Sequence, residues 1–140
     1  MKRIIGIDPG ETTGYCQVLI QGDKIVPVRW EEIPLDNLVD TLNSLLMPLT
    51  DYEVAIESVV ITGKLNNDKV RQIQAYDRSF LIGSKKHKVS IITPGMRKSA
   101  KVDVPKAVKG NHARDAYRLA VTKHLLEEQY AGKITTETNS

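Results

Sequence analysis

Cysteine is almost absent from this sequence of 140 residues, which contains only Cys16. A single cysteine excludes a disulfide framework and a cysteine-based zinc site within one chain, and it suits a reducing compartment. No apolar run approaches the roughly 20 residues that a membrane-spanning helix needs. The first residues do not resemble a secretory signal peptide either. We therefore expect a cytoplasmic protein with no membrane partner.

Basic residues are scarce in the first part of the chain and concentrated in the middle. Residues 1–60 carry four Lys or Arg against ten Asp or Glu, whereas residues 61–110 carry twelve against three. The last thirty residues carry four of each sign, so the net charge of +3 conceals a basic central segment. Such a segment favours a face that binds phosphate backbones, with a solvated lysine-rich surface as the alternative.

The apolar pattern predicts eight elements in one domain. Strands are predicted, from apolar runs bounded by turn residues, at Ile4–Ile7, Tyr15–Ile20, Lys24–Ile33, Glu53–Glu57 and Val89–Ile92. Helices are predicted at Leu35–Leu46, at Asn66–Leu81 and from an N-cap at Asn111 to about Tyr130. Pro27 places the third strand at an edge or a bulge. Residues 96–110 are assigned to a loop with room for one short helix.

This order of elements predicts an α/β fold. A meander of three strands followed by strand-helix alternation implies a five-stranded mixed sheet, with two parallel strands and helices on both faces. Residues 1–130 form the single predicted domain, and residues 131–140 are a polar tail that we expect to be flexible.

Acidic residues follow two predicted strands at the point where each strand ends. Asp8 comes after Ile4–Ile7, and Glu57 ends the fourth strand. Asp115 lies in the first turns of the last helix, and the i, i+3 spacing places His112 on the same helix face. Taken singly, these residues suit a turn, an ion pair or a helix N-terminus. Together they favour a site, because these element ends can converge.

Carboxylates gathered at the ends of buried strands repel one another, and a divalent cation removes that repulsion. Mg²⁺ prefers oxygen ligands, and about two such ions could bind the attacking water and the leaving oxygen of a phosphodiester. Gly6, Gly10 and Gly14 lie near Asp8, where small residues would let a nucleic-acid backbone approach closely. The residues therefore favour phosphodiester hydrolysis with Mg²⁺ or Mn²⁺.

Three motifs resemble the RuvC family of Holliday junction resolvases. Residues 5–10 with 13–15, Ile-Gly-Ile-Asp-Pro-Gly and Thr-Gly-Tyr, resemble the family's opening strand and turn. Residues 55–59, Ala-Ile-Glu-Ser-Val, resemble its second acidic motif, and residues 112–116, His-Ala-Arg-Asp-Ala, its closing motif. The motifs keep the family's order and similar separations over residues 4–124. The small size is similar to that of the RuvC-like proteins of bacteriophages, and a phage origin would make the location the host cytoplasm.

The resemblance implies an RNase H-like fold and a crossover junction endodeoxyribonuclease that depends on a divalent metal. It implies Asp8, Glu57 and Asp115 as catalytic, metal-binding acids. It also implies His112 as a further ligand or water-positioning group, and Lys98 as the lysine that the family has near the scissile phosphate.

The resemblance further implies a homodimer through the helix at about 66–81, with two sites that nick a four-way junction symmetrically. Two departures from the family bear on the substrate. Val60 stands where many members have an aromatic wedge, which is therefore either missing or supplied elsewhere, by Tyr76 or Phe80. Residues 94–111 leave little room for the extra helix that the family has there. Both departures predict broader branched substrates, namely forks, flaps and three-way junctions besides Holliday junctions.

Three other functions fit parts of the pattern. One is an RNase H-like module that holds branched DNA without cutting it, and another is an RNase H-like nuclease with a different nucleic-acid substrate. The third is a phosphotransferase of the actin and sugar-kinase type. That class needs two such domains around a nucleotide, and the chain has the length of one, so we expect no nucleotide cofactor.

The basic residues are interpreted as contacts to the DNA backbone, which give affinity and salt sensitivity rather than sequence readout. Cys16, His87 and His124 are interpreted as structural or incidental. The predicted backbone contacts are Lys64, Lys85, Lys86, Lys88, Arg97, Lys98, Lys101, Lys106 and Lys109.

Overall fold

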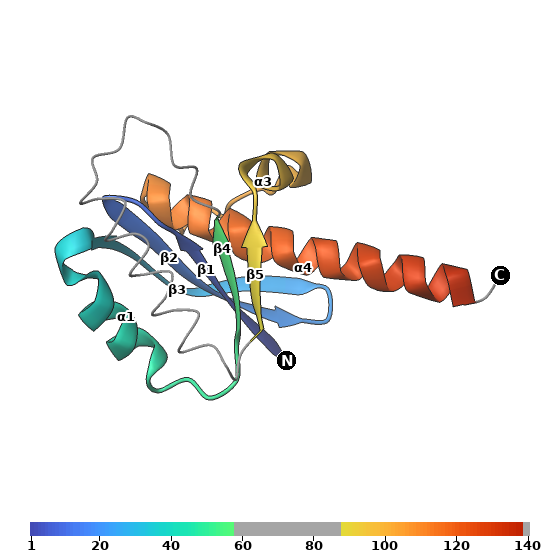
Figure 1. Cartoon of the computed structure of the whole chain (residues 1–140), viewed down its shortest axis with the longest axis horizontal. Helices are drawn as coiled ribbons and strands as arrows, with labels where there is room; N and C mark the ends of the chain where they lie inside the picture. The colour runs from blue at the N-terminus through green and yellow to red at the C-terminus, as the bar shows by residue number, and fades with distance from the viewer. Residues whose placement is uncertain (58–87, 139–140) are drawn as a thin grey trace.

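The computed structural model describes residues 1–57 and 88–138, with side chains as far as residue 129. Its centre is a five-stranded sheet in the order β3-β2-β1-β4-β5 (Figure 1). The strands are β1 (Lys2–Asp8), β2 (Thr12–Gln21), β3 (Lys24–Pro34), β4 (Glu53–Glu57) and β5 (Val89–Ile92). The first three pair antiparallel, whereas β4 and β5 are added in parallel beside β1. The predicted mixed sheet is confirmed.

Pro27 lies both at a sheet edge and at a bulge. The strand that carries it, β3, is the outermost strand of the sheet. Gln17 pairs with Arg29, but Val18 pairs with Pro27, so Val28 has no opposite partner. Both positions tolerate the missing N–H of proline, so this prediction is confirmed.

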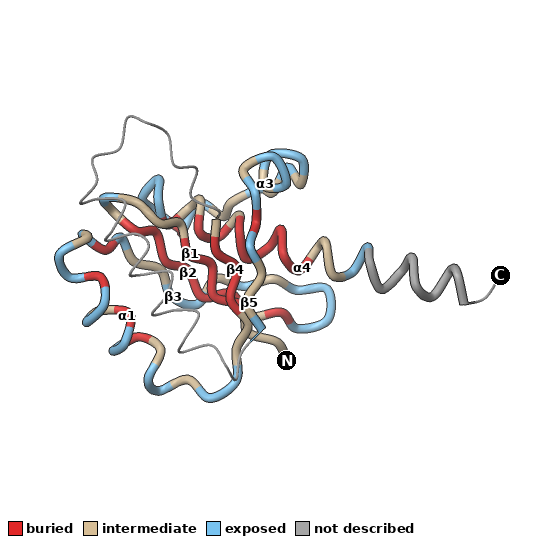
Figure 2. The backbone as a smooth tube through the Cα atoms, viewed as in Figure 1, coloured by how far each residue is buried: buried red, intermediate tan, exposed pale blue. Residues whose placement is uncertain are grey.

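Helices cover both faces of the sheet, as predicted. After a 3₁₀ turn at Leu35–Asn37, α1 (Leu38–Leu46) buries Leu38, Leu42 and Leu45. That spacing places the three side chains on one helical stripe against the first face. On the other face, α4 (Asn111–Thr138) packs its small residues on β1 and β2. Figure 2 shows the buried residues along the central strands and the first half of α4.

Between β5 and α4 the chain forms a short helix. α3 (Pro94–Ala100) begins after Thr93, whose side chain accepts a hydrogen bond from the Met96 N–H at 3.1 Å. Pro94 occupies the first helical position, where its missing N–H does no harm. Lys101 ends the helix in the left-handed conformation, with φ 50°. The short helix expected in this segment is confirmed, although it begins at Pro94, before the predicted residues 96–110.

The last helix differs from the prediction at both ends. It begins at Asn111 itself, and the carbonyl of Gly110 accepts the first helical hydrogen bond, from the Arg114 N–H at 2.9 Å. Gly110, with φ 95°, therefore takes the N-cap position predicted for Asn111. The helix continues to Thr138 rather than ending near Tyr130. No helix in the described part of the chain is long and apolar enough to cross a membrane.

Candidate active site

Asp8 and Glu57 lie next to each other at the ends of two neighbouring strands, β1 and β4. Their strands are parallel neighbours in which Ile7 pairs with Ile56, so the two acids occupy the next position on each strand. Carboxyl ends of parallel strands meet at one edge of a sheet, which is why the sequence pattern brings these residues together. Both side chains are largely buried, with 15% of Asp8 and 12% of Glu57 exposed.

The start of α4 brings two further residues to this edge. His112 Nδ1 lies 3.8 Å from Asp8 Oδ2, and the charge of Asp115 acts on Asp8 as well. At the helix N-terminus, the His112 N–H donates to Glu32 Oε1 at 3.3 Å. This contact between β3 and α4 orients the first turn. All four residues predicted as metal ligands therefore gather at one place.

Two glycines set how closely α4 approaches the sheet. A Cβ at Gly6 would lie 1.9 Å from the Ala116 carbonyl oxygen, and one at Gly14 would lie 1.9 Å from that of His112. We expected these glycines to admit a nucleic-acid backbone, and at Gly6 and Gly14 that was wrong. The backbone that they admit is that of α4. Gly10 differs, because among the described residues a Cβ there would meet only the Thr12 carbonyl oxygen, at 3.3 Å.

The gathered acids perturb one another. Burial raises the pKa of Asp8, and a side-chain hydrogen bond with Glu57 and the charges of Glu57 and Asp115 raise it further. Arg97 opposes this shift without cancelling it. A cation bound beside these carboxylates would relieve the repulsion that raises the pKa of Asp8.

Arg97 is the functional candidate whose role the sequence analysis missed. It was interpreted as a DNA contact, but its guanidinium lies among the acids and is only 19% exposed. Nη1 donates to Asp115 Oδ1 at 2.9 Å, and Nη2 donates to Glu57 Oε1 at 3.3 Å. A second arginine, Arg118, contacts only Asp115 here, with Nη1 2.7 Å from the same oxygen. Lys98, the predicted residue, is exposed on α3.

The donor chemistry of this edge fits a hard divalent cation. Three carboxylates and one imidazole are the ligand types that Mg²⁺ and Mn²⁺ accept. As they stand, however, no three acidic, histidine or cysteine side chains among residues 1–57 and 88–129 are arranged to hold one ion. Two of these carboxylates, Glu57 and Asp115, contact Arg97 instead.

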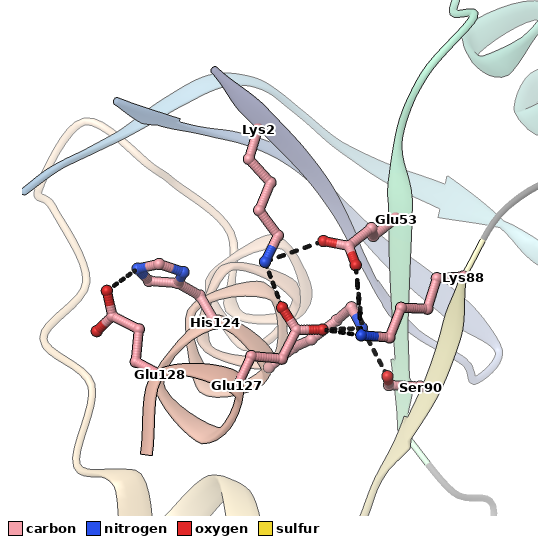
Figure 3. A network of polar contacts seen from close by, with 8 residues as sticks. Lys2, Glu53, Lys88, Ser90, His124, Glu127 and Glu128 are labelled. Carbon is pink, nitrogen blue, oxygen red and sulfur yellow. Dashed lines mark hydrogen bonds and ion pairs between the residues drawn. The ribbon is translucent and has the colours of Figure 1, made fainter. Parts of the chain in front are cut away.

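The remaining predicted contacts divide into three groups. Lys101, Lys106 and Lys109 are exposed between α3 and α4. Lys88 lies at the opposite end of the sheet, where it pairs with Glu127 at 2.9 Å (Figure 3). Outside the described residues lie the predicted dimer helix at 66–81, with Tyr76 and Phe80 in it, and Val60, Lys64, Lys85, Lys86 and His87.

Two residues interpreted as structural or incidental lie away from the acids. Cys16 is buried in the core, which raises the pKa of its thiol to about 12. His124 Nε2 lies 3.2 Å from Glu128 Oε1 on the next turn of α4.

No protein-family model matches the sequence, and a search of curated proteins finds no match either. Solved structures do match, and they define the fold as RNase H-like in its RuvC form. RuvC of Thermus thermophilus in complex with a Holliday junction substrate has a TM-score of 0.75 at 15% identity. The alignment covers 92% of this chain and 96% of that one.

Two further structures agree on the fold. Another structure of Thermus thermophilus RuvC matches with a TM-score of 0.70 at 16% identity, covering 91% of this chain and 96% of that chain. The Fowlpox virus resolvase in complex with Holliday junction DNA matches with a TM-score of 0.56 at 14% identity, covering 86% and 97%. The predicted RuvC-like fold is confirmed, and at these identities the likeness concerns the fold.

Proposed function

We propose that this chain is a divalent-metal-dependent endonuclease that cuts Holliday junctions and other branched DNA, including forks, flaps and three-way junctions. The observation that carries the proposal is the convergence of Asp8, Glu57, Asp115 and His112 at one sheet edge. Two of the similar structures are resolvases solved with junction DNA, which supports the choice of substrate.

In this proposal Asp8, Glu57, Asp115 and His112 hold about two Mg²⁺ or Mn²⁺ ions. Metal bound there would activate water and neutralise charge developing on the phosphate. Arg118 orients Asp115 through its contact at 2.7 Å. Glu32 orients the turn that carries His112.

DNA binding is assigned to the exposed lysines between α3 and α4, namely Lys101, Lys106 and Lys109. They follow α3, whose Arg97 reaches the acids, so a bound backbone would pass the candidate site. The proposal keeps a single domain over residues 1–130, a homodimer through residues 66–81 and the cytoplasm as location, in a host cell if the origin is a phage.

One observation favours a second function. Arg97 pairs with two of the candidate metal ligands and so partly neutralises them through a side chain of the protein itself. A junction-binding module that never cuts would have this property. Such a module would bind the junction without cleaving a strand.

The test is a panel of labelled four-way junction, fork, flap, three-way junction and linear duplex DNA, incubated with Mg²⁺, Mn²⁺ or chelator. Asp8→Asn is the control, because it keeps the shape of the side chain and removes its charge. Metal-dependent nicking of branched substrates that is lost in the control supports the nuclease. Tight binding without cutting under any metal would establish the binding module instead.

A further inference from the structure

A guanidinium lies in the candidate site against two of the carboxylates that a metal would need. Arg97 forms both contacts through different nitrogens, Nη1 with Asp115 and Nη2 with Glu57. Because a guanidinium presents its N–H groups as a fixed fork, this is an arrangement that lysine cannot reproduce. In the described residues, Arg97 is the cation that bridges these two acids.

The surroundings indicate that these contacts hold Arg97 reversibly. Its Nε is buried without a hydrogen-bond partner in the described residues, so the side chain is not fully satisfied where it lies. α3, which carries it, has no buried residue. Movement of this short helix would therefore disturb little of the core.

We propose that Arg97 and a divalent metal ion compete for Glu57 and Asp115. Arg97 holds the two acids in the metal-free protein, and metal binding releases it. This inference rests on the proposed function only in taking these acids as metal ligands, and it concerns binding rather than cleavage. Competition of this kind is a negative coupling between two occupants of one set of ligands.

The test is the affinity of the full chain for Mn²⁺ without DNA, measured by isothermal titration calorimetry for wild type, Arg97→Gln and Lys98→Gln. Lys98→Gln is the matched control, because it removes the same charge from the next position on α3. We expect Arg97→Gln to bind Mn²⁺ at least about fivefold more tightly, which is the low end of such couplings. Lys98→Gln should stay within about twofold of wild type.

The second measurement is the melting temperature in chelator. Arg97→Gln should melt below wild type, since its acids lose their counter-ion, and Mn²⁺ should remove the difference. If Arg97→Gln does not fold, Arg97→Lys keeps the charge but not the fork, and its Mn²⁺ affinity should exceed that of wild type.

Equal or weaker Mn²⁺ binding by the folded Arg97 variant would overturn the competition. Metal-dependent cleavage by wild type would then leave the proposed nuclease standing. Absence of Mn²⁺ binding in wild type and variant alike would overturn the competition as well. With no cleavage of any substrate, it would also remove the metal-dependent function.

Discussion

Arg114 shapes the segment that presents the exposed lysines. From the first turns of α4 it donates hydrogen bonds to the carbonyls of Val108, Pro105 and Val104, at 2.9, 3.2 and 3.5 Å. These carbonyls belong to a stretch with no regular structure, where backbone groups need partners from elsewhere. A side chain of the helix thus organises the loop in front of it.

Arg114→Gln should loosen this loop. The variant loses charge-assisted hydrogen bonds to carbonyls, so we expect a fall of about 1–3 kcal/mol in the free energy of unfolding. Junction affinity should fall too, because Lys106 and Lys109 are no longer held in place. Urea denaturation and electrophoretic mobility shift measure the two effects. Unchanged stability would contradict the assigned role of Arg114.

At the scale of single residues, the sequence predicted which acids meet but not which cation joins them. Asp8 and Glu57 lie at the ends of strands, and the pattern of apolar residues predicts where those strands end. The choice between Arg97 and Lys98 depends on the rotation of α3, since neighbours on a helix point about 100° apart. That rotation follows from where the helix begins, at Pro94. The predicted loop covered residues 96–110, so the helix start at Pro94, and with it the rotation of α3, was not predicted.

Among the elements, α4 packs along the sheet, and two of its contacts there have distinct roles. Near its start, its backbone rests on Gly6 and Gly14. Further along, Lys123 is 1% exposed and contacts Ser90 at 2.6 Å and Glu127 at 2.8 Å, and these two partners are labelled in Figure 3. The first contact positions the candidate site, and the second ties the helix to the opposite end of the sheet.

Gly14→Ala should displace the start of α4. Its Cβ would collide with the carbonyl of His112, which the backbone cannot avoid without moving the helix. We expect a loss of about 1–3 kcal/mol of stability, as for other overpacked positions, and a larger proportional loss of metal-dependent cleavage. Gly95→Ala is the control for stability, since its Cβ would meet only Thr93 Oγ1, at 3.9 Å. Equal melting temperatures for both variants would refute this explanation.

The contact between Lys123 and Glu127 should make the free energy of unfolding depend on pH in the acidic range. Burial alone would raise the pKa of Glu127, but hydrogen bonds from Lys123, Lys2 and Lys88 outweigh it and lower the pKa to about 2. A carboxyl whose pKa is lower in the folded state stabilises the fold above its unfolded value of 4.5. That contribution is lost as the pH falls from there toward about 2.

Thermal denaturation between pH 6 and pH 2, in steps of roughly half a unit, measures this loss. Glu127→Gln should melt below wild type at pH 6, and the difference should shrink as the pH falls through the same window. A constant difference across the range would show that the carboxylate charge contributes nothing.

The elements themselves were largely predictable, and their ends were not. Strands and the stripe of α1 follow directly from hydrophobic periodicity. The N-cap is Gly110 rather than Asn111. A helix end depends on its tertiary contacts, and here the Glu32 carboxylate of β3, far away in the sequence, accepts from the His112 N–H. Such a contact is invisible in a local pattern.

For the whole molecule, the uneven charge of the sequence becomes a testable property. Lys101→Ala, Lys106→Ala and Lys109→Ala together should weaken binding to all branched substrates alike. If each lysine contacts one phosphate, the slope of log affinity against log salt should fall by about 2–3. Lys24→Ala, at the exposed start of β3, is the control. A loss confined to one base sequence would contradict backbone contacts.

The fold as a whole followed from the order of elements, because a meander followed by strand-helix alternation admits few arrangements. The motifs at residues 5–15, 55–59 and 112–116 then indicated the RuvC form of this fold. The short distance between α4 and the sheet was not predictable. Gly6 and Gly14 permit it, but nothing in the sequence around them indicates that a helix packs on them.

That closeness offers a way to recognise distant homologues. A chain that keeps α4 this near the sheet has almost no alternative to glycine at the positions of Gly6 and Gly14, whatever else has changed. Adding those two positions to Asp8, Glu57 and Asp115 yields a search signature in which packing and chemistry constrain each other. Such a signature suits a sequence that family models miss and that shares about 15% identity with its structural neighbours.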